Sequence, residues 1–113
     1  GEATSSISVG GLIETSEGVK AASIEIGRRG EVRGPIVGGN VLVRERARVE
    51  DVYADSLTME ENSRARNVYV RKMYVESGCK ILGETQYIEA LEKEEEVLFA
   101  QTPVKVEKLP PPI

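Results

Sequence analysis

The sequence predicts an all-β fold, a parallel β-helix (β-solenoid) of about five coils with a repeat of 16–17 residues. One observation is a series of apolar pairs whose first members are 17, 16 and 16 residues apart: Ile24 and Ile26, Val41 and Val43, Leu57 and Met59, Met73 and Val75. Another is a series in the same register that combines a small residue with an apolar one: Gly30 and Val32, Ala47 and Val49, Ser63 and Ala65, Cys79 and Ile81. Residues two positions apart face one side of a strand, so each coil should contain short inward-facing segments separated by corners.

One corner of each coil is predicted from residues that tolerate a positive φ. Four positions after the small residues comes a column that holds Gly34, Asp51, Asn67 and Gly83. Because Gly, Asn and Asp adopt the left-handed region at the lowest steric cost, this corner is expected to pass through that region in every coil. The single extra residue of the 17-residue spacing is placed at Pro35. A helix is a poor alternative, because stretches such as 40–43 alternate with a period of two.

The repeat weakens towards both ends of the chain. On the N-terminal side, Ile7 and Val9 fit the apolar pair one repeat earlier. On the C-terminal side the strict spacing places a Glu in the apolar column, and a slip of one residue would instead turn Ile88 and Ala90 inward. Two interpretations of residues 84–96 therefore stay open: a degenerate final coil, or a short helix that caps the solenoid, since this run is rich in good helix formers.

These boundaries divide the chain into a flexible N-terminal tail (1–6), a β-helix domain (7–99), and an edge strand with a proline-rich tail (100–113). Residues 102–109 alternate enough for the edge strand, and Pro110–Pro112 must leave any sheet in an extended conformation. The prolines form either a solvated tail or a docking segment for a partner protein.

The composition argues against several classes of chemistry. One Phe, four Tyr and no Trp in 113 residues mean that Val, Ile and Leu must fill the interior. The chain has no His, which removes the catalytic His of β-helix acyltransferases and the zinc ligands of related carbonic anhydrases. Cys79 falls in the small-residue column and is interpreted as a buried structural thiol instead of a nucleophile. We therefore predict no catalytic residue, no cofactor and no metal site.

Charge suggests one candidate surface. In register, Arg48, Arg64 and Lys80 form a like-charged column that repels itself unless carboxylates such as Glu50 interleave or an anion lies along it. The column is either a solvated surface that deters lateral sheet association, or a contact for an anionic partner or a membrane surface. A net charge of −4 and sparse aromatic residues argue against nucleic acid as a partner.

Three smaller features complete the survey of the surface. Tyr53 and Tyr69 share a column and should stack on an outer face, either to stabilise neighbouring coils or as a ligand platform. Glu94–Glu96 is interpreted as a solvated face. No apolar run approaches the roughly 18 residues that span a bilayer, which favours a cytoplasmic protein. The start at Gly1 leaves a missing targeting segment open.

The segment from Val19 to Gly83 resembles the bactofilins, a family of polymer-forming cytoskeletal proteins. The resemblance lies in Ile24-Glu25-Ile26, Gly30-Glu31-Val32-Arg33-Gly34, Val41-Leu42-Val43 and Cys79-Lys80-Ile81-Leu82-Gly83. The ending from Val104 to Pro111 is similar to the tails of archaeal members. The resemblance implies a right-handed β-helix that assembles end to end into filaments without nucleotide and serves as a scaffold, often at a membrane.

Physical chemistry favours the same function. A terminal coil presents unpaired N–H and C=O groups and an open apolar column, which must be capped or paired with another molecule. The expected polymer contacts lie in residues 7–15 and 87–99, with these apolar anchors: Ile7, Val9, Leu12, Leu98 and Phe99. The alternative is a binding or sensor module of a larger protein, which uses the basic column or the proline tail. A hydrolase of the kind seen on long β-helices is disfavoured, because so short a solenoid builds no substrate groove.

Overall fold

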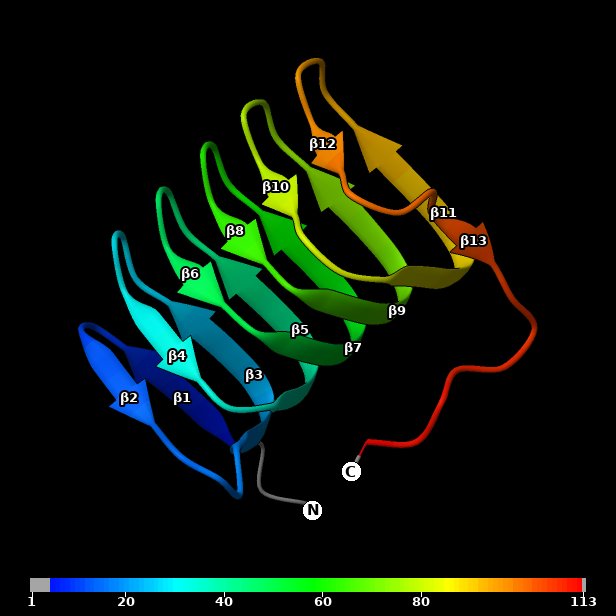
Figure 1. Ribbon diagram of the computed structural model, residues 1–113. Helices are drawn as coiled ribbons and strands as arrows, with labels where there is room; N and C mark the ends of the chain where they lie inside the picture. The colour runs from blue at the N-terminus through cyan, green and yellow to red at the C-terminus, as the bar shows by residue number, and fades with distance from the viewer. Residues whose placement is uncertain (1–4, 113) are drawn as a thin grey trace.

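The computed structural model describes residues 5–112, which form a parallel β-solenoid without any helix (Figure 1). The seven-stranded sheet contains, in spatial order, β1 (Ser6–Val9), β3 (Val19–Ile26), β5 (Ile36–Val43), β7 (Asp51–Met59), β9 (Asn67–Val75), β11 (Thr85–Lys93) and β13 (Val104–Lys105). The six-stranded sheet contains β2 (Leu12–Glu14), β4 (Glu31–Arg33), β6 (Arg48–Val49), β8 (Arg64–Ala65), β10 (Lys80–Ile81) and β12 (Leu98–Phe99). The predicted all-β parallel β-helix is confirmed.

The solenoid has about six turns, one more than the sequence predicts, and β13 completes the last of them. The predicted columns are the observed register: Ile24 pairs with Val41, Val41 with Leu57, and Leu57 with Met73. The extra residue lies where it was expected. Val32 pairs with Val49 and Ile36 with Val52, so the segment that contains Pro35 is one residue longer than its counterpart in the next coil.

Each long strand bends near its middle and thereby forms two sides of the coil. In β3 the pairing with β5 includes Ala21 and Ser23 but skips the residue between them, and the buried positions lie on both sides of this break. We call the half before the bend (Val19–Ala21 and its partners) the first wall and the half after it (Ser23–Ile26 and its partners) the second wall. The six-stranded sheet is the third wall, so every complete coil has the three inward-facing segments that were predicted.

The interior is a column of aliphatic side chains that runs along the axis. Ile26, Ile36, Val43, Met59 and Val75 each have 0% of their surface exposed. The small-residue column is buried as expected. Cys79 is fully covered, and its Sγ lies 3.2 Å from Ser63 Oγ and 3.0 Å from the carbonyl oxygen of Glu60. Burial raises the pKa of this thiol, and the predicted burial of Cys79 in the small-residue column is confirmed.

The prediction for the left-handed corner is wrong for most coils. Of the predicted column only Gly34 has a positive φ, of 135°. The left-handed residues stand five positions before the predicted ones: Arg29, Arg46, Asn62 and Gly78, with φ values of 60°, 60°, 62° and 79°. Glu96, with a φ of 63°, holds the same place in the turn of the last coil. In three of these turns the backbone closes a four-residue turn, since the amides of Gly30, Ala47 and Ser63 donate to the carbonyl oxygen three residues earlier. A left-handed third residue is what a type II turn requires.

Asp51 and Asn67 serve their corner through their side chains instead. They begin strands β7 and β9, and Asn67 Nδ2 donates to Asp51 Oδ1 at 2.9 Å. Asn67 Oδ1 in turn accepts from the backbone amide of Glu84 at 2.8 Å. Short polar side chains at this corner therefore satisfy backbone groups of the next coil.

Residues 84–96 form strand β11 and the corner after it, and not the capping helix that was the alternative interpretation. The pairing of β11 with β9 shifts between Tyr87 and Ala90, and after the shift Leu91 pairs with Met73 and Lys93 with Val75. The inward residue is therefore Leu91, which packs against the core, and the predicted inward turn of Ile88 and Ala90 is wrong. The bulge lengthens the spacing to the preceding coil from 17 residues at Tyr87 to 18 at Ala90, whereas the expected slip would have shortened it.

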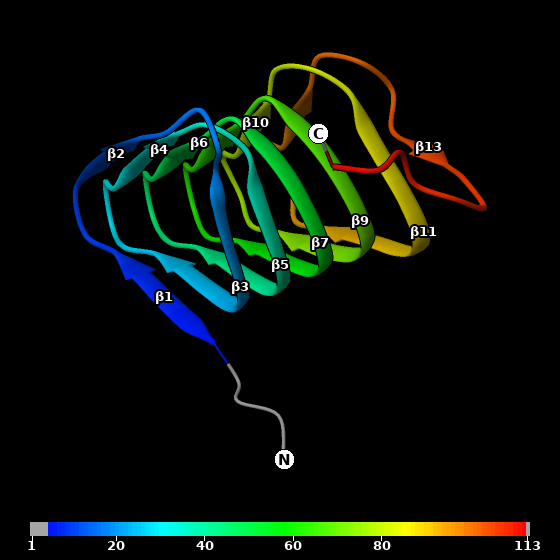
Figure 2. The same cartoon turned by 90° about the horizontal axis from the view of Figure 1, so that it is seen from below.

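The chain ends follow the expected boundaries only in part. Residues 1–4 of the predicted N-terminal tail and Ile113 lie outside the described residues, and β1 already begins at Ser6. The edge strand is the two-residue β13, which pairs with Gln86 and Tyr87 of β11. After β13 the chain turns back along the outside of the first wall, where Leu109–Pro112 and Tyr53 line one shallow groove (Figure 2). Residues 5–112 contain no helix long and apolar enough to cross a membrane.

Thr85 is a polar residue in a column of the core that is otherwise aliphatic, and it leads to a prediction. Thr85 follows Val19, Ile36, Val52 and Val68 in the first wall, is 1% exposed, and its hydroxyl finds no hydrogen-bond partner among the described residues. A buried hydroxyl without a partner costs about 1–3 kcal/mol. We expect Thr85→Val to raise the free energy of unfolding by about 1 kcal/mol in urea titration, and Thr102→Val, at an exposed position, to leave it unchanged. A loss of stability in Thr85→Val would show that the hydroxyl is satisfied.

Candidate functional site

The N-terminal end of the solenoid exposes strand edges. Strands β1 and β2 each pair on one side only, with β3 and β4, so their outer edges have no partner among the described residues. Leu12 on β2 is 56% exposed, and Ile7 is half-buried. Val9 is only 3% exposed. Of the predicted anchors at this end, Leu12 and Ile7 are therefore accessible, whereas Val9 is a core residue of the first coil.

The C-terminal end is partly closed. Strand β13 covers Gln86 and Tyr87 of β11, but Ala90–Lys93 and β12 have no partner on their outer side among the described residues. Leu98 is 52% exposed and Phe99 packs half-buried against the core. Lys93 stands at the inward position that Val75 occupies one coil earlier, and its side chain is exposed. This end therefore combines apolar residues with a charge.

The basic column exists as the sequence predicts. Arg48 pairs with Arg64 and Lys80 with Arg64 along the third wall, and all three side chains are exposed. None of them forms an ion pair with a described residue. Glu50 does not interleave, because its Oε1 accepts from the backbone amide of Gly34 at 2.9 Å. The column is therefore a row of uncompensated positive charge.

A second charged surface lies at the corner between the second and third walls, and it was not found from the sequence. We call it the charged corner: residues 27–30, 44–47, 60–63, 76–79 and 94–97. Its second coil carries Arg28 and Arg29, whereas its last coil carries Glu94–Glu96. The sign of its charge therefore changes along the solenoid axis. The sequence does contain a signal for it, because these residues keep the register of the apolar columns.

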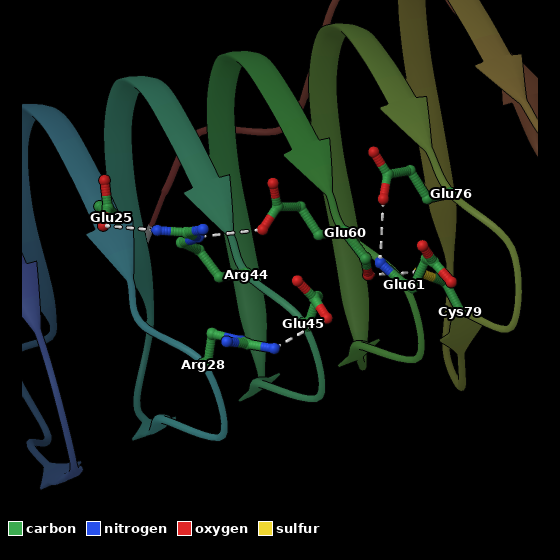
Figure 3. A network of polar contacts seen from close by, with 8 residues as sticks. All are labelled: Glu25, Arg28, Arg44, Glu45, Glu60, Glu61, Glu76 and Cys79. Atoms are coloured by element: carbon green, nitrogen blue, oxygen red, sulfur yellow. Dashed lines mark hydrogen bonds and ion pairs between the residues drawn. The ribbon is translucent and has the colours of Figure 1, made fainter.

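Ion pairs and hydrogen bonds link neighbouring coils along the charged corner (Figure 3). Arg44 lies between two carboxylates, with Nε 3.0 Å from Glu60 Oε1 and a guanidinium nitrogen 3.8 Å from Glu25 Oε2. The Arg28 guanidinium pairs with Glu45 at 3.3 Å. Such exposed pairs each contribute about 0–1 kcal/mol, so the charged corner is more a feature of surface potential than of stability.

The acidic half of the charged corner is hydrogen-bonded to the backbone. Glu76 accepts from the amide of Glu61, and burial raises the pKa of its carboxyl group. Glu94 accepts from the amide of Ser77 and from the hydroxyl of Tyr74, and these hydrogen bonds lower the pKa of Glu94. The sequence-based interpretation of 94–96 as a merely solvated face is therefore incomplete, because Glu94 is exposed but also fixes the preceding coil.

The two tyrosines form the expected contact between coils. The rings of Tyr53 and Tyr69 stack with centroids 5.0 Å apart at an angle of 25°. The hydroxyl of Tyr69 donates to Glu84 Oε2 at 2.9 Å, and the ring is 9% exposed. Burial, together with the neighbouring Glu84 carboxylate, raises the pKa of Tyr69 to about 12.

The raised pKa of Tyr69 predicts a loss of stability at alkaline pH. An unfolded tyrosine titrates near pH 10, so between about pH 10 and 12 the unfolded chain releases its proton first and becomes favoured. We expect the free energy of unfolding of the wild type to fall across this window, and part of that fall to be absent in Tyr69→Phe. The measurement is urea unfolding at several alkaline pH values. If the free energy of unfolding fell equally steeply with pH in the wild type and in Tyr69→Phe, the raised pKa could not be assigned to Tyr69.

Comparison with protein-family models, with curated proteins and with solved structures finds no match to this chain. Among residues 5–112, no group of three or more His, Cys, Asp or Glu side chains is placed to hold a metal ion. The candidate surfaces are therefore the two ends, the basic column and the charged corner, and a β-solenoid with such surfaces is consistent with a structural or scaffold role.

Proposed function

We propose that this chain is a non-enzymatic structural protein that assembles end to end into nucleotide-independent filaments, as its resemblance to the bactofilins implies. The observation that supports the proposal is that both ends of the solenoid expose unpaired strand edges. Each end leaves strand edges without a partner among the described residues, next to accessible apolar side chains such as Leu12 and Phe99. Backbone pairing with a second copy satisfies these groups and extends the apolar interior.

Electron microscopy of the pure protein across salt concentrations tests the proposal. We expect filaments of the wild type without added nucleotide. Phe99→Asp places a charge at the C-terminal end of the interior and should abolish them. Leu82→Asp is the control, because Leu82 is 53% exposed and follows β10, which is covered by β12 and is not a free edge. A wild-type protein that sediments as a monomer at high concentration, without filaments, would contradict the proposal.

The basic column favours a second candidate function, a module that contacts an anionic surface such as a membrane. The test is co-sedimentation with vesicles of anionic lipid. Replacing Arg48, Arg64 and Lys80 by Gln should remove binding, which should also weaken with salt. The matched control removes the same charge from three cations that carboxylates already pair: Arg28, Arg66 and Arg71. If both triple variants lost vesicle binding equally, binding would depend on the net charge of the protein and not on a site at the basic column.

A further inference from the structure

We propose that copies of this chain join head to tail, and that each joint is one composite coil to which two copies contribute. In this coil β13 of one copy supplies the first wall, and β1 and β2 of the next copy supply the second and third walls. The inference rests on the proposed end-to-end assembly and adds the polarity and the geometry of the contact. It follows from the strand partners that the described residues lack at each end.

The two incomplete coils are complementary. Strand β1 pairs with Ser23–Ile26 of β3, so the first coil has a second wall, but no described residue pairs with Val19–Ala21 from beneath. Strand β13 pairs with Gln86 and Tyr87 of β11, so the last turn has a first wall and nothing above Ala90–Lys93. The wall that each end lacks is the wall that the other end provides.

The strand register shows that both segments fit into one coil without overlap. Following the paired columns, β1 of a second copy would lie above β11 with Ser6 over Ala90 and Ile7 over Leu91. The two segments meet at the bend. There the amide of Val106 still donates to the carbonyl oxygen of Tyr87, and the carbonyl oxygen of Ser5 accepts from Ser23. One chain leaves the solenoid at the corner where the next one enters.

The charged corner is complementary across a head-to-tail joint. A head-to-tail joint places the Glu94–Glu96 coil against Gly10 and Gly11, where a side-chain carbon would meet nothing within 4 Å. Arg28 and Arg29 stand in the next coil, within reach across this gap.

A further contact comes from the interior of the last coil. Lys93, the inward charge of the last coil, can lay its alkyl chain under Val9 of the next copy and extend its ammonium group towards Glu94–Glu96.

The axial repeat of filaments of the unaltered protein is the first test. Six turns per copy, spaced by about 4.8 Å, give a repeat of about 29 Å when all copies point the same way. Alternating joints give about 58 Å, because two opposed copies then form the repeat. Helical reconstruction or fibre diffraction distinguishes these values. Filaments with the longer repeat would overturn the head-to-tail inference and leave the proposed function intact, whereas the absence of filaments would contradict the proposed function itself.

The second test uses two variants, each blocked at one end. The carbonyls of Ser5 and Val9 accept from β3 and its following residue, so by alternation the amide of Ser8 faces the free edge. The amide of Glu94 donates to β9, so that of Lys93 faces the free edge of β11. Ser8→Pro and Lys93→Pro each remove one free-edge donor without removing a hydrogen bond of the monomer. Ser8→Ala and Lys93→Ala keep the donors and are the matched controls.

Analytical ultracentrifugation gives the outcome. For a head-to-tail joint, each proline variant alone is a monomer, and an equimolar mixture forms a dimer of twice the mass through the one intact pair of ends. Circular dichroism must show that both variants keep the β-solenoid spectrum. A proline variant that dimerises by itself would overturn the inference, because it would show that like ends join. A mixture that stays monomeric while the wild type forms filaments would also overturn it.

Discussion

Leu57→Ala is expected to lower the free energy of unfolding by about 2–5 kcal/mol, because it opens a cavity in the middle of the solenoid. Leu57 is 1% exposed in β7, and it lies between Val41 of the preceding coil and Met73 of the following one. In a solenoid each coil contacts only its neighbours, so a defect in a central coil weakens the connection between the two halves of the molecule. Urea unfolding, followed by circular dichroism, measures the change.

The matched control is Leu12→Ala, which removes the same atoms from a side chain that is 56% exposed at the N-terminal end. A monomer should lose at most about 0.5 kcal/mol from this substitution. The comparison must be made at a concentration at which the protein is monomeric, because Leu12 is also a predicted polymer contact. Equal losses in the two variants would show that the central column is not the main source of stability.

Gly34→Ala is expected to cost at least about 1–3 kcal/mol, because its backbone is closed to side chains. Gly34 has a φ of 135°, and a side-chain carbon at this position would collide with the carbonyl oxygen of Thr15 in the preceding coil. The corner cannot relax easily, since the amide of Gly34 also donates to Glu50. The change should appear as a lower midpoint of urea unfolding.

Gly10→Ala provides the control for Gly34→Ala. Gly10 has no positive φ, and a side-chain carbon there meets nothing within 4 Å. The urea midpoint of the Gly10→Ala variant should therefore stay close to that of the wild type or rise slightly. If the two alanine variants were equally stable, the contact of Gly34 with Thr15 would not be the constraint that the geometry indicates.

The apolar register could be predicted from the sequence because every coil repeats the same environment. Ile24, Val41, Leu57 and Met73 differ in shape but meet one requirement, which is to fill the interior above and below an equivalent residue. The position of the insertion at Pro35 followed from the same columns. Such inference is reliable where each column is constrained by its neighbours on both sides.

The corners were harder to predict because one residue type can satisfy a corner in two ways. Asp51 and Asn67 suggested a left-handed backbone, but their side chains make hydrogen bonds instead: Asp51 Oδ1 accepts from Asn67 Nδ2, and Asn67 Oδ1 accepts from the backbone amide of Glu84. The left-handed residues are Arg29, Arg46 and Glu96, among others, whose side chains give no sign of such a conformation. Closure of the coil imposes this geometry against local preference.

The C-terminal end departed from expectation for a related reason. Residues 84–96 contain good helix formers, yet the free edge of β9 pairs with them along most of β11. Pairing with an existing strand outweighs helix propensity, which is a weak contribution per residue. The bulge between Tyr87 and Ala90 then sets which residues face inward, and a bulge leaves no mark in a repeat that is read by spacing alone.

The complementary ends also bear on how the length of the molecule can change. The first and last described strands, β1 and β13, meet the same corner from opposite sides, so the described strands make a whole number of turns. Duplication of one 16-residue coil, such as the segment from Asp51 to Arg66, would lengthen the molecule by about 4.8 Å and leave both termini in the same angular position. The length of the subunit can therefore change in steps of one coil. Insertion or deletion of whole repeats in the gene would preserve the ability of the subunit to join its neighbours.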